Sequence, residues 1–588
     1  MYWMLHVWAL TTGLTAALTQ YNTNGRSKWG TLPSPTLPRF LRDTHGANPP
    51  WGNTYPGGNP PDTGVTRHYN FTITRGFKAP DGYNKSVILI NDQFPGPLIE
   101  ANWGDMIEVT VTNDISTVEE GLTLHWHGLS MKKTPWYDGV PGYTQCPIAP
   151  GKTFTYIFQA DQFGSSWYHS HYSAQYDDGL YGPMVIYGPV QAEVNYDYDL
   201  GPIMLSDYYH DNYYDVLVEG FKRPTVLVPI DNNLINGKGT FDCDSTLTNK
   251  CLPGAGLSKF QVKSGKSYRL RLVNTGALAS QKFSIDNHKL TVIANDFVPV
   301  KPYLTDVVTL GVGQRTDVIV EATGSASDSV WMRSDIDILC LNETSTVYNV
   351  SAAVYYESAN TSALPTTRGT PWKSNHCQND PLETTVPYYP LAPPSTPETV
   401  QTVNITLGYN ETGFLLFFVD GSSFRSNYNE PVLLMTHENT SQVYPAERNI
   451  YNFGSNSSVR IVLVNTFAMQ HPIHLHGHNF WVLAEGMGTW NGSITNPSNP
   501  QRRDTQIIQA GTVDEPGYLV LEWEQNNPGV WPMHCHMSNH ASAGLVLSIL
   551  ERPDDIGKLT IPATLSKTCR DWDQFSDANY VDEIDSGI

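Results

Sequence analysis

Four short histidine-rich segments hold the side chains with the clearest capacity for chemistry. The chain has 18 histidines in 588 residues, for which random placement predicts about 0.5 His-X-His pairs, yet five such pairs occur. The segments are His125-Trp-His127, His169-Ser-His171, His471-Pro-Ile-His474-Leu-His476-Gly-His478, and His534-Cys535-His536 followed by His540. Side chains at i and i+2 of a strand share one face, roughly 6.5 Å apart, so each pair can reach one metal ion or two adjacent ions. The pattern predicts a metal centre.

The segment His534-Cys535-His536 is the most informative of the four. If it is extended, Cys535 projects from one face and both histidines from the other, so the thiolate and the imidazoles would serve different metals. One Cys with two His is the ligand set of a blue electron-transfer copper, and His471 and His540 are the natural partners. The chain has seven cysteines, of which six could pair, so this role also accounts for the odd one. The segment therefore predicts two metal sites joined by a few covalent bonds.

The overall composition predicts an all-β scaffold of several domains. A chain of 588 residues exceeds what one hydrophobic core usually serves, so roughly two to four domains are expected. Charged residues are only 16%, while 47 Gly, 41 Pro and 32 Tyr supply turn formers and strand-favouring aromatic rings. The net charge of −21 repels phosphate backbones and anionic lipids, so nucleic acid and membrane surfaces are not expected partners.

Short runs of alternating apolar residues, separated by Gly and Pro turns, predict β-strands from about residue 68 onward. Examples are residues 86–90, 106–112, 154–158, 184–187, 268–273, 316–320, 459–464 and 518–523. They fall into three sandwich-sized blocks. Residues 361–398, rich in Pro, Ser and Thr, are predicted to be a linker between the second and third blocks.

The N-terminal residues and the sequons predict export. Residues 1–20 are largely apolar and end in small residues, as in a signal peptide, and residues 21–64 read as a propeptide or loose extension. No later apolar run is long enough to span a bilayer. Ten Asn-X-Ser/Thr sequons, which are glycosylated only on the secretory route, occur at Asn70, Asn84, Asn342, Asn349, Asn360, Asn404, Asn410, Asn439, Asn456 and Asn491. We expect a secreted, extracellular glycoprotein.

These residues resemble the multicopper oxidases, and most closely the laccases of filamentous ascomycete fungi. The likeness covers roughly residues 65–588 and all four histidine segments. It implies three consecutive cupredoxin-like Greek-key β-sandwich or barrel domains, at residues 65–192, 193–360 and 399–556, followed by a C-terminal tail at 557–588.

Carried over by position, the resemblance implies four copper ions held by ten histidines and one cysteine. The type 1 copper would be held by His471, Cys535 and His540, and the type 2 copper by His125 and His474. The ligands of the type 3 pair would be His127, His169, His171, His476, His534 and His536. The histidine at position 478 is not a ligand in the family, although its spacing alone would allow it.

The resemblance also marks three residues near the coppers. Leu545 stands where the family carries the axial residue of type 1 copper, and a missing thioether there generally raises the redox potential. Asp138 resembles the acid that helps protonate reduced oxygen, and Asp231 resembles the acid that receives a phenolic proton. The segment Met537-Ser-Asn-His540 departs from the usual ascomycete pattern of Ile, Ala and Trp before this histidine. The resemblance therefore does not define the residues at the rim of the substrate site.

The remaining cysteines allow fifteen pairings. Cys243 with Cys251 would close a short loop, and the resemblance suggests Cys146 with Cys569 and Cys340 with Cys377. The chain ends Asp585-Ser-Gly-Ile588, which resembles the C-terminal signature of ascomycete laccases, where the last residues enter the solvent channel to the trinuclear coppers.

The function implied is that of a laccase. It would oxidise phenolic and aromatic amine substrates by single electrons at the type 1 copper and reduce dioxygen to water at the other three, as a monomer. Ferroxidase and ascorbate oxidase activity are the enzymatic alternatives. A copper-binding or storage protein without turnover is a third, against which the complete His534-Cys535-His536 relay argues. Lignin-derived phenols and pigment precursors both remain open as natural substrates.

Overall fold

The computed structural model describes residues 60–588, apart from gaps at 117–118, 192, 223–227, 244–250, 253–254, 342–347, 375–376, 439–442, 580 and 582–584. The predicted signal peptide and nearly all of the predicted propeptide therefore lie outside the described residues. The described residues form six β-sheets, two in each of three successive parts of the chain, which confirms the all-β class. The exact domain boundaries stay a prediction.

The first sandwich consists of two four-stranded sheets, in the orders β2-β1-β4-β6 and β3-β8-β7-β5. Its strands are β1 (Thr66–Lys78), β2 (Lys85–Ile90), β3 (Ile99–Asn102), β4 (Met106–Asn113), β5 (His125–Trp126), β6 (Thr153–Gln159), β7 (Gly164–His169) and β8 (Tyr181–Tyr187). In β4 every second residue is buried, as the alternating sequence requires. The pairing of β5 with β7 sets His125 opposite His169. Two of the histidine segments thereby meet on one sheet.

The second sandwich has a six-stranded sheet, β10-β9-β12-β17-β14-β15, and a five-stranded sheet, β11-β19-β18-β13-β16. Its strands are β9 (Tyr198–Tyr208), β10 (Asn232–Ile235), β11 (Lys259–Val262), β12 (Ser267–Asn274), β13 (Gln281–Ile285), β14 (Leu290–Asn295), β15 (Val298–Thr305), β16 (Val308–Leu310), β17 (Arg315–Glu321), β18 (Ser329–Ile336) and β19 (Asn349–Tyr356). Between β19 and the next strand, the described residues of the predicted linker form no strand.

The third sandwich repeats this plan with the orders β21-β20-β23-β28-β25-β26 and β22-β30-β29-β24-β27. Its strands are β20 (Thr399–Tyr409), β21 (Leu415–Val419), β22 (Ile450–Asn452), β23 (Ser458–Asn465), β24 (His471–Leu475), β25 (Phe480–Met487), β26 (Gln501–Arg503), β27 (Thr505–Ile508), β28 (Gly517–Glu524), β29 (Gly529–Cys535) and β30 (Val546–Glu551). The pairing of β24 with β29 sets His474 opposite His534. The other two histidine segments thus also share a sheet.

The described residues form five α-helices, of which only α6 is longer than ten residues. They are α2 (Tyr213–Lys222), α3 (Val432–His437), α4 (Ser538–Ser542), α5 (Pro553–Ile556) and α6 (Ala563–Ala578), with 3-10 turns η1 (Pro135–Tyr137), η2 (Gln175–Asp178), η4 (Ile338–Leu341) and η5 (Ala446–Arg448). Helix α6 lies in the segment that the sequence marked only as a tail. It buries Trp572 completely and carries Cys569, which is disulfide-bonded to Cys146 of the first sandwich. The bridges Cys243–Cys251 and Cys340–Cys377 are also present.

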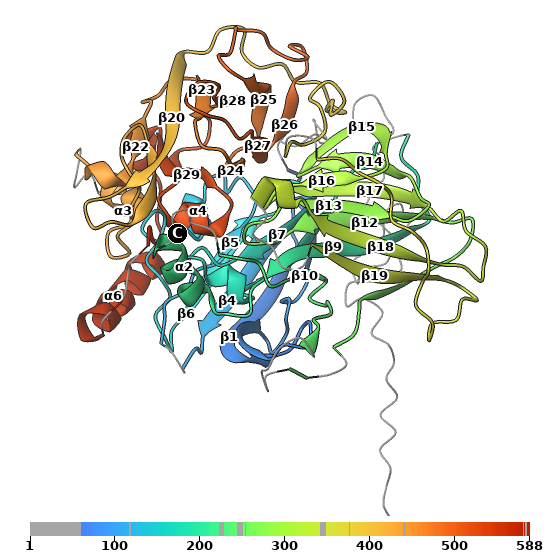
Figure 1. Ribbon diagram of the computed structural model, residues 1–588. Coiled ribbons are helices and arrows are strands. Elements are labelled where there is room, and N and C mark those ends of the chain that lie inside the picture. Colours follow the sequence, from blue (N-terminus) through green and yellow to red (C-terminus); the bar gives the residue numbers. More distant parts are fainter. Residues whose placement is uncertain are drawn as a thin grey trace, which may run out of the picture.

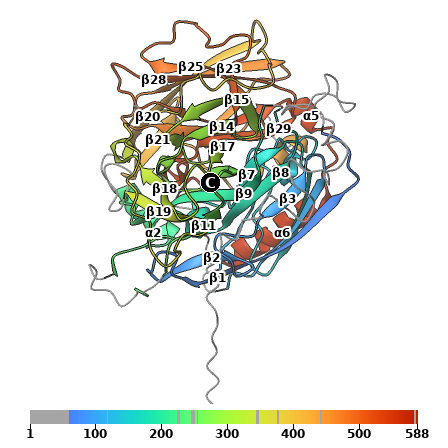
Figure 2. The same cartoon turned by 90° about the vertical axis from the view of Figure 1, so that its right-hand side faces the viewer.

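The first and third sandwiches share one hydrophobic core, whereas the second has its own. The shared core includes Trp126 and Val109 from the first sandwich and Trp531, Met533 and Cys535 from the third. In Figure 1, β24 and β29 lie directly beside β5 and β7, with the second sandwich to the right. Figure 2, seen from the side of the second sandwich, shows the third above it and the first below. The four histidine segments therefore converge where the first and third sandwiches meet.

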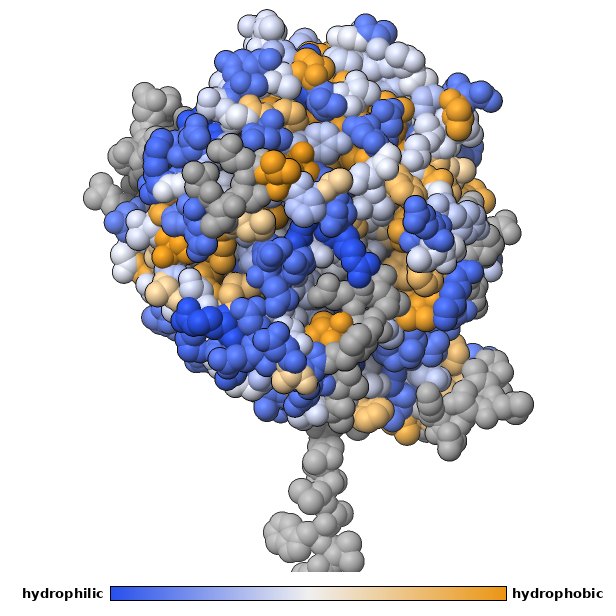
Figure 3. Space-filling view, turned by 90° about the vertical axis from the view of Figure 1, so that its left-hand side faces the viewer, coloured by the Kyte–Doolittle hydropathy of each residue, from blue (hydrophilic) through white to orange (hydrophobic). Residues whose placement is uncertain are grey.

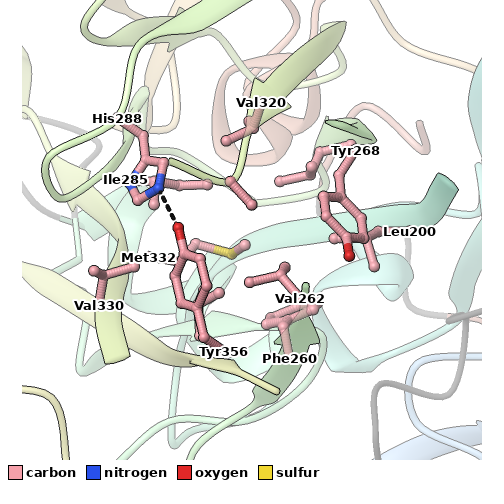
Figure 4. A pocket seen from close by; sticks show the side chains of 13 residues that line it. Leu200, Phe260, Val262, Tyr268, Ile285, His288, Val320, Val330, Met332 and Tyr356 are labelled. Atoms are coloured by element: carbon pink, nitrogen blue, oxygen red, sulfur yellow. Dashed lines mark hydrogen bonds between the residues drawn. The ribbon is translucent and has the colours of Figure 1, made fainter. Parts of the chain in front are cut away.

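The core of the second sandwich contains a small apolar cavity of about 20 Å³ (Figure 4). Its polar lining includes His288, whose Nδ1 lies 2.7 Å from the Asp286 carbonyl and whose Nε2 lies 2.8 Å from the Tyr356 hydroxyl. Both ring nitrogens are engaged, so this histidine has a structural role.

One face of the molecule is mainly polar (Figure 3). Figure 3 shows the side that lies on the left in Figure 1, where hydrophilic side chains dominate and apolar ones occur in separate small groups. Among the described residues, the chain has no helix long and apolar enough to cross a membrane.

Candidate metal centre

The structure brings all eleven predicted copper ligands into groups of three, with the potential ligand atoms of each group within 4.8 Å of one another. The groups are His471, Cys535 and His540; His127, His169 and His536; His171, His476 and His534; and His125, His127 and His474. All of these residues are buried. Residues separated by more than 400 positions in the chain thus face one another.

The Cys535 group lies in the interior of the third sandwich. Cys535 ends β29, His471 begins β24, and His540 lies on α4, five residues beyond the cysteine. The sulfur lies 3.6 Å from Nδ1 of each histidine, and the two Nδ1 atoms are 3.1 Å apart. The ring of Phe417 packs 4.7 Å from that of His540. Two nitrogens and a sulfur thereby converge on one small volume in an apolar surrounding.

Leu545 is tied to this group through the backbone. Its N–H donates to the His540 carbonyl at 3.0 Å, and its carbonyl accepts from the Cys535 N–H at 3.1 Å. The side chain is 2% exposed. The position predicted as axial is therefore occupied by a buried group that cannot bind metal.

Eight histidines form a second, larger group between the first and third sandwiches. His476 Nε2 lies 3.1 Å from His534 Nε2, and His536 Nε2 lies 3.2 Å from His127 Nδ1. His534 and His536 thus point into the eight-histidine group, whereas Cys535 between them contacts His471 and His540. This opposite orientation is the one expected of an extended His-Cys-His segment.

Three of the histidines have one ring nitrogen hydrogen-bonded to a backbone carbonyl. The Nδ1 atoms of His125, His169 and His474 lie 2.8, 2.9 and 2.8 Å from the carbonyl oxygens of Asp138, Ser170 and Asp504. The Nε2 atoms of the same three rings are buried and have no hydrogen-bond partner. Buried polar atoms are normally paired, and second contacts of this kind orient metal-binding histidines. The donor set therefore fits metal ions, and a thiolate with imidazoles fits copper.

Burial favours the neutral form of several of these imidazoles, and the neutral form is the one that binds metal. Burial lowers the pKa of His534 to about 4 and that of His540 to about 3. Burial also lowers the pKa of His471, His474 and His476 well below the usual value, and neighbouring histidines lower it further. The pKa of the Cys535 thiol is raised by burial, so only a bound metal would favour the thiolate there.

Asp138 joins two parts of the eight-histidine group. Its carboxylate oxygens lie 2.9 Å from His476 Nδ1 and 3.2 Å from His125 Nδ1. The residue is fully buried at the end of η1. It can orient both rings.

Sequence reasoning missed a second carboxylate, Asp504, which lies between β26 and β27. Its Oδ1 lies 3.1 Å from His127 Nε2, and Arg315 of β17 donates to both of its oxygens at 2.6 Å. Arg503 in turn donates to Asp296 at 2.9 Å. The sequence signal that could have found Asp504 is the run of three charged residues at 502–504 in a strand-rich block. Such runs usually lie in solvent, so the signal is weak. The second sandwich thus supports ligands that it does not itself supply.

Asp231 lies in the second sandwich, directly before β10, whereas the predicted ligands come from the first and third. The backbone N–H of His210 donates to its carboxylate at 2.8 Å. The pKa of Asp231 is raised by burial, and the His210 N–H opposes that shift. A carboxylate with a raised pKa is a better proton acceptor than a solvated one.

The Nε2 atom of His478 lies 2.7 Å from Glu551 Oε2, outside the groups described above. The contact gives this histidine a partner in β30.

The last four residues, 585–588, are buried, and in Figure 1 the C-terminus lies beside α4. Ser586 donates from its hydroxyl to the Ala541 carbonyl at 2.8 Å, and the Tyr428 hydroxyl donates to the Gly587 carbonyl at 2.7 Å. Gly587 has φ +88°, and a Cβ there would come within 3.0 Å of Ser426, so the path requires glycine. Ile588 lines a cavity of about 20 Å³ together with His169, His171, His534 and His536.

Comparison with known proteins agrees with this geometry. Family profiles described as multicopper oxidase match residues 72–191, 199–358 and 420–555. An oxidoreductase named OpS5 from Beauveria bassiana is 39% identical over 90% of this chain and 89% of its own length. Laccase-2 from Botryotinia fuckeliana is 36% identical over 90% and 89%. The crystal structure of the laccase from Botrytis aclada superimposes with a TM-score of 0.82 at 35% identity, covering 90% of this chain and 96% of that one. The chain accordingly belongs to the multicopper oxidase family and is a copper-dependent oxidoreductase.

Proposed function

We propose that the protein is a laccase, which oxidises phenolic and aromatic amine donors one electron at a time and reduces dioxygen to water. The observation that carries the proposal is the placement of Cys535 against His471 and His540, with its two neighbours in the eight-histidine group. Likeness to fungal proteins named laccases supports it.

Four copper ions would account for the donor groups. The Cys535 group suits a type 1 copper. His125 and His474 suit the type 2 copper. The type 3 pair would be held by one trio of His127, His169 and His536 and another of His171, His476 and His534. When bound, copper supplies one-electron redox chemistry, accepting electrons from the donor at the first group and passing them to dioxygen at the second.

The protein's own residues would orient the ligands and move protons. Asp138 holds the rings of His125 and His476, and we assign it proton delivery to reduced oxygen. Asp231 would accept the phenolic proton. Leu545, in place of a thioether, would leave the Cys535 site with a high potential, which suits the oxidation of phenols.

The C-terminal residues would act as a plug on the dioxygen side. Ile588 closes the small cavity beside the type 3 histidines. Ser173 lines both this cavity and a larger one of about 680 Å³, which Asp585 of the tail also lines. The tail would thus separate the histidines from the larger cavity. We further propose that the protein is secreted, N-glycosylated and monomeric.

Oxygen uptake by the purified copper-loaded protein tests the function. Syringol-type phenols, ascorbate and Fe(II) would be compared as donors under identical conditions. A laccase should show the highest kcat/KM with the phenols and should release no peroxide. A preference for Fe(II) or ascorbate would assign one of the other oxidase activities, and copper binding without any oxygen uptake would indicate a storage role.

A further inference from the structure

We propose that Asp81, a buried carboxylate of the first sandwich, is a positioning residue for Asp231. The inference rests on the proposed role of Asp231 as acceptor of the phenolic proton and adds the device that holds its carboxylate in place. Asp81 lies between β1 and β2 and is 2% exposed.

The first connection runs through His210. The ring Nε2 of His210 donates to Asp81 Oδ2 at 2.8 Å. The backbone N–H of the same residue donates to Asp231 Oδ2 at 2.8 Å. His210 therefore contacts Asp81 with its ring and Asp231 with its main chain, so a shift of the ring is transmitted to the bond that holds Asp231.

The second connection runs through Asn232, the residue directly after Asp231. Its side-chain amide donates to the same Asp81 Oδ2 at 2.8 Å, and it is 1% exposed. Asn232 begins β10 and pairs with Tyr208 of β9. Asp81 Oδ2 thus accepts hydrogen bonds from Asn232, which follows Asp231 in the sequence, and from His210, which is hydrogen-bonded to Asp231.

Aromatic packing prevents the His210 ring from turning. Tyr83 stacks on it with ring centroids 3.9 Å apart and planes 4° from parallel, and Phe241 meets its edge at 4.5 Å. The N–H of Tyr83 donates to the other carboxylate oxygen of Asp81 at 2.9 Å. Both oxygens of Asp81 are engaged, and the loop after β1 is tied to β9 and β10 of the second sandwich.

The charge balance agrees with this geometry. Burial raises the pKa of Asp81, but the hydrogen bonds from His210 and Asn232 outweigh it and leave the pKa below its usual value, so Asp81 remains an anionic acceptor. The pKa of Asp231 is raised by burial and by the charge of Asp211, and it is lowered by His210 and Lys85. The hydrogen bond from the His210 N–H is the largest of the interactions that lower the pKa of Asp231, so displacement of His210 would raise that pKa further.

The test compares Asp81→Ala and Asp81→Asn with the parent enzyme, using 2,6-dimethoxyphenol and ferrocyanide as donors with and without an acidic proton. We expect Asp81→Ala to lower kcat/KM for the phenol by about tenfold, because a small misplacement of a reacting group is costly. Ferrocyanide oxidation should change by less than about twofold, and the blue absorbance should stay. The acid limb of the phenol profile should move to higher pH. Asp81→Asn keeps one oxygen that can accept from His210 and Asn232 but sets its NH2 against the Tyr83 N–H, so it should recover part of the activity.

Two further variants make the result specific. In an Asp231→Asn background, Asp81→Ala should add no further loss to the phenol-to-ferrocyanide ratio, since both act through one group. Asp286→Ala, which removes a buried carboxylate paired with Arg333 elsewhere in the second sandwich, should leave that ratio unchanged. His210→Phe, which keeps the stack on Tyr83 but loses the bond to Asp81, replaces Asp81→Ala if the latter does not fold.

The outcomes separate the two hypotheses. Equal loss with both donors, or independent losses in the double variant, would overturn the positioning role while leaving Asp231 as acceptor. An Asp231→Asn variant with an unchanged donor ratio would overturn the acceptor role and this inference with it.

Discussion

At the scale of single residues, the sulfur of Cys535 is the group on which donor oxidation depends. Cys535→Ser replaces a soft ligand with a hard one, so the intense visible absorption of a copper–thiolate site should disappear and substrate oxidation should stop. Copper held by the eight histidines should remain, because none of those ligands is changed. The visible spectrum, the copper content and oxygen uptake check this. A variant that stays blue and active would contradict the type 1 assignment.

Asp231 carries a prediction about both donor type and pH. Losing an electron from a phenol is easier when its proton leaves too, so Asp231→Asn should lower kcat/KM for phenols far more than for ferrocyanide. Burial raises the pKa of Asp231, so its accepting form is lost as pH falls through a value above the ordinary 3.8. Phenol oxidation by the parent should therefore have an acid limb that the variant lacks. Similar losses with both donors would mean that Asp231 only shapes the pocket.

At the scale of elements, β17 of the second sandwich supports ligands of the other two. Arg315→Met would leave Asp504 buried without its counter-charge, and an uncompensated buried charge typically costs about 3–5 kcal/mol. His127 would also lose its fixed partner, and such losses reduce metal affinity about 10–100-fold. We expect less copper in the eight-histidine group and an unchanged Cys535 spectrum.

Copper analysis and electron paramagnetic resonance measure that effect. Arg460→Met, which breaks an ion pair with Glu522 at a partly buried site of the third sandwich, is the matched control and should keep full copper content. Equal copper loss in both variants would point to general destabilisation rather than to ligand support.

The C-terminal segment is the second element with a testable role. Deleting residues 585–588, or extending the chain beyond Ile588, would change the wall of the cavity beside the type 3 histidines. We expect a changed rate of reoxidation by dioxygen in the fully reduced enzyme. The blue absorbance should be unaffected, because neither variant changes Cys535, His471 or His540. Unchanged reoxidation and turnover in both variants would show that the tail is not a plug.

At the scale of the whole molecule, buried acids should make stability depend on pH. Burial raises the pKa of Asp161 from 3.8 to about 6. The folded state then binds the proton more tightly than the unfolded chain. The contribution of protonated Asp161 to the free energy of unfolding is therefore fully present below pH 3.8 and is lost as the pH rises through about 6. The loss is roughly 3 kcal/mol at most.

When measured at a pH well above 6, the thermal midpoint of Asp161→Asn should therefore be higher than that of the parent. At a pH below 3.8 the two midpoints should be nearly equal. Asp514→Asn, at an exposed position, serves as control and should have little effect at either pH. A variant at position 161 that is less stable than the parent at high pH would show that the charged form is needed in the fold.

Much of the molecule could be read from the sequence alone. The alternation at residues 106–112 revealed a strand, because a half-buried strand imposes a period of two that is local in the chain. Residues 518–523 are buried on both faces, and there a short apolar run between turn residues was the signal. The histidine spacings and His534-Cys535-His536 identified a copper centre because ligands two residues apart share a face before any tertiary contact exists. Helix α6 lies in the segment that the sequence predicted only as a tail, because its buried residues are only Leu565, Thr568 and Trp572, too few to give a clear helical period.

Only the tertiary structure decided which distant groups meet. Asp504 contacts His127 across 377 positions and is held by Arg315 from a third part of the chain, and no local pattern encodes such a contact. The same holds for Asp81 and His210, whose bond spans 129 positions. The spacing of the ligands is local and can be seen in the sequence. The residues that orient the ligands and balance their charge are brought to them by the packing of three sandwiches, which depends on the whole chain.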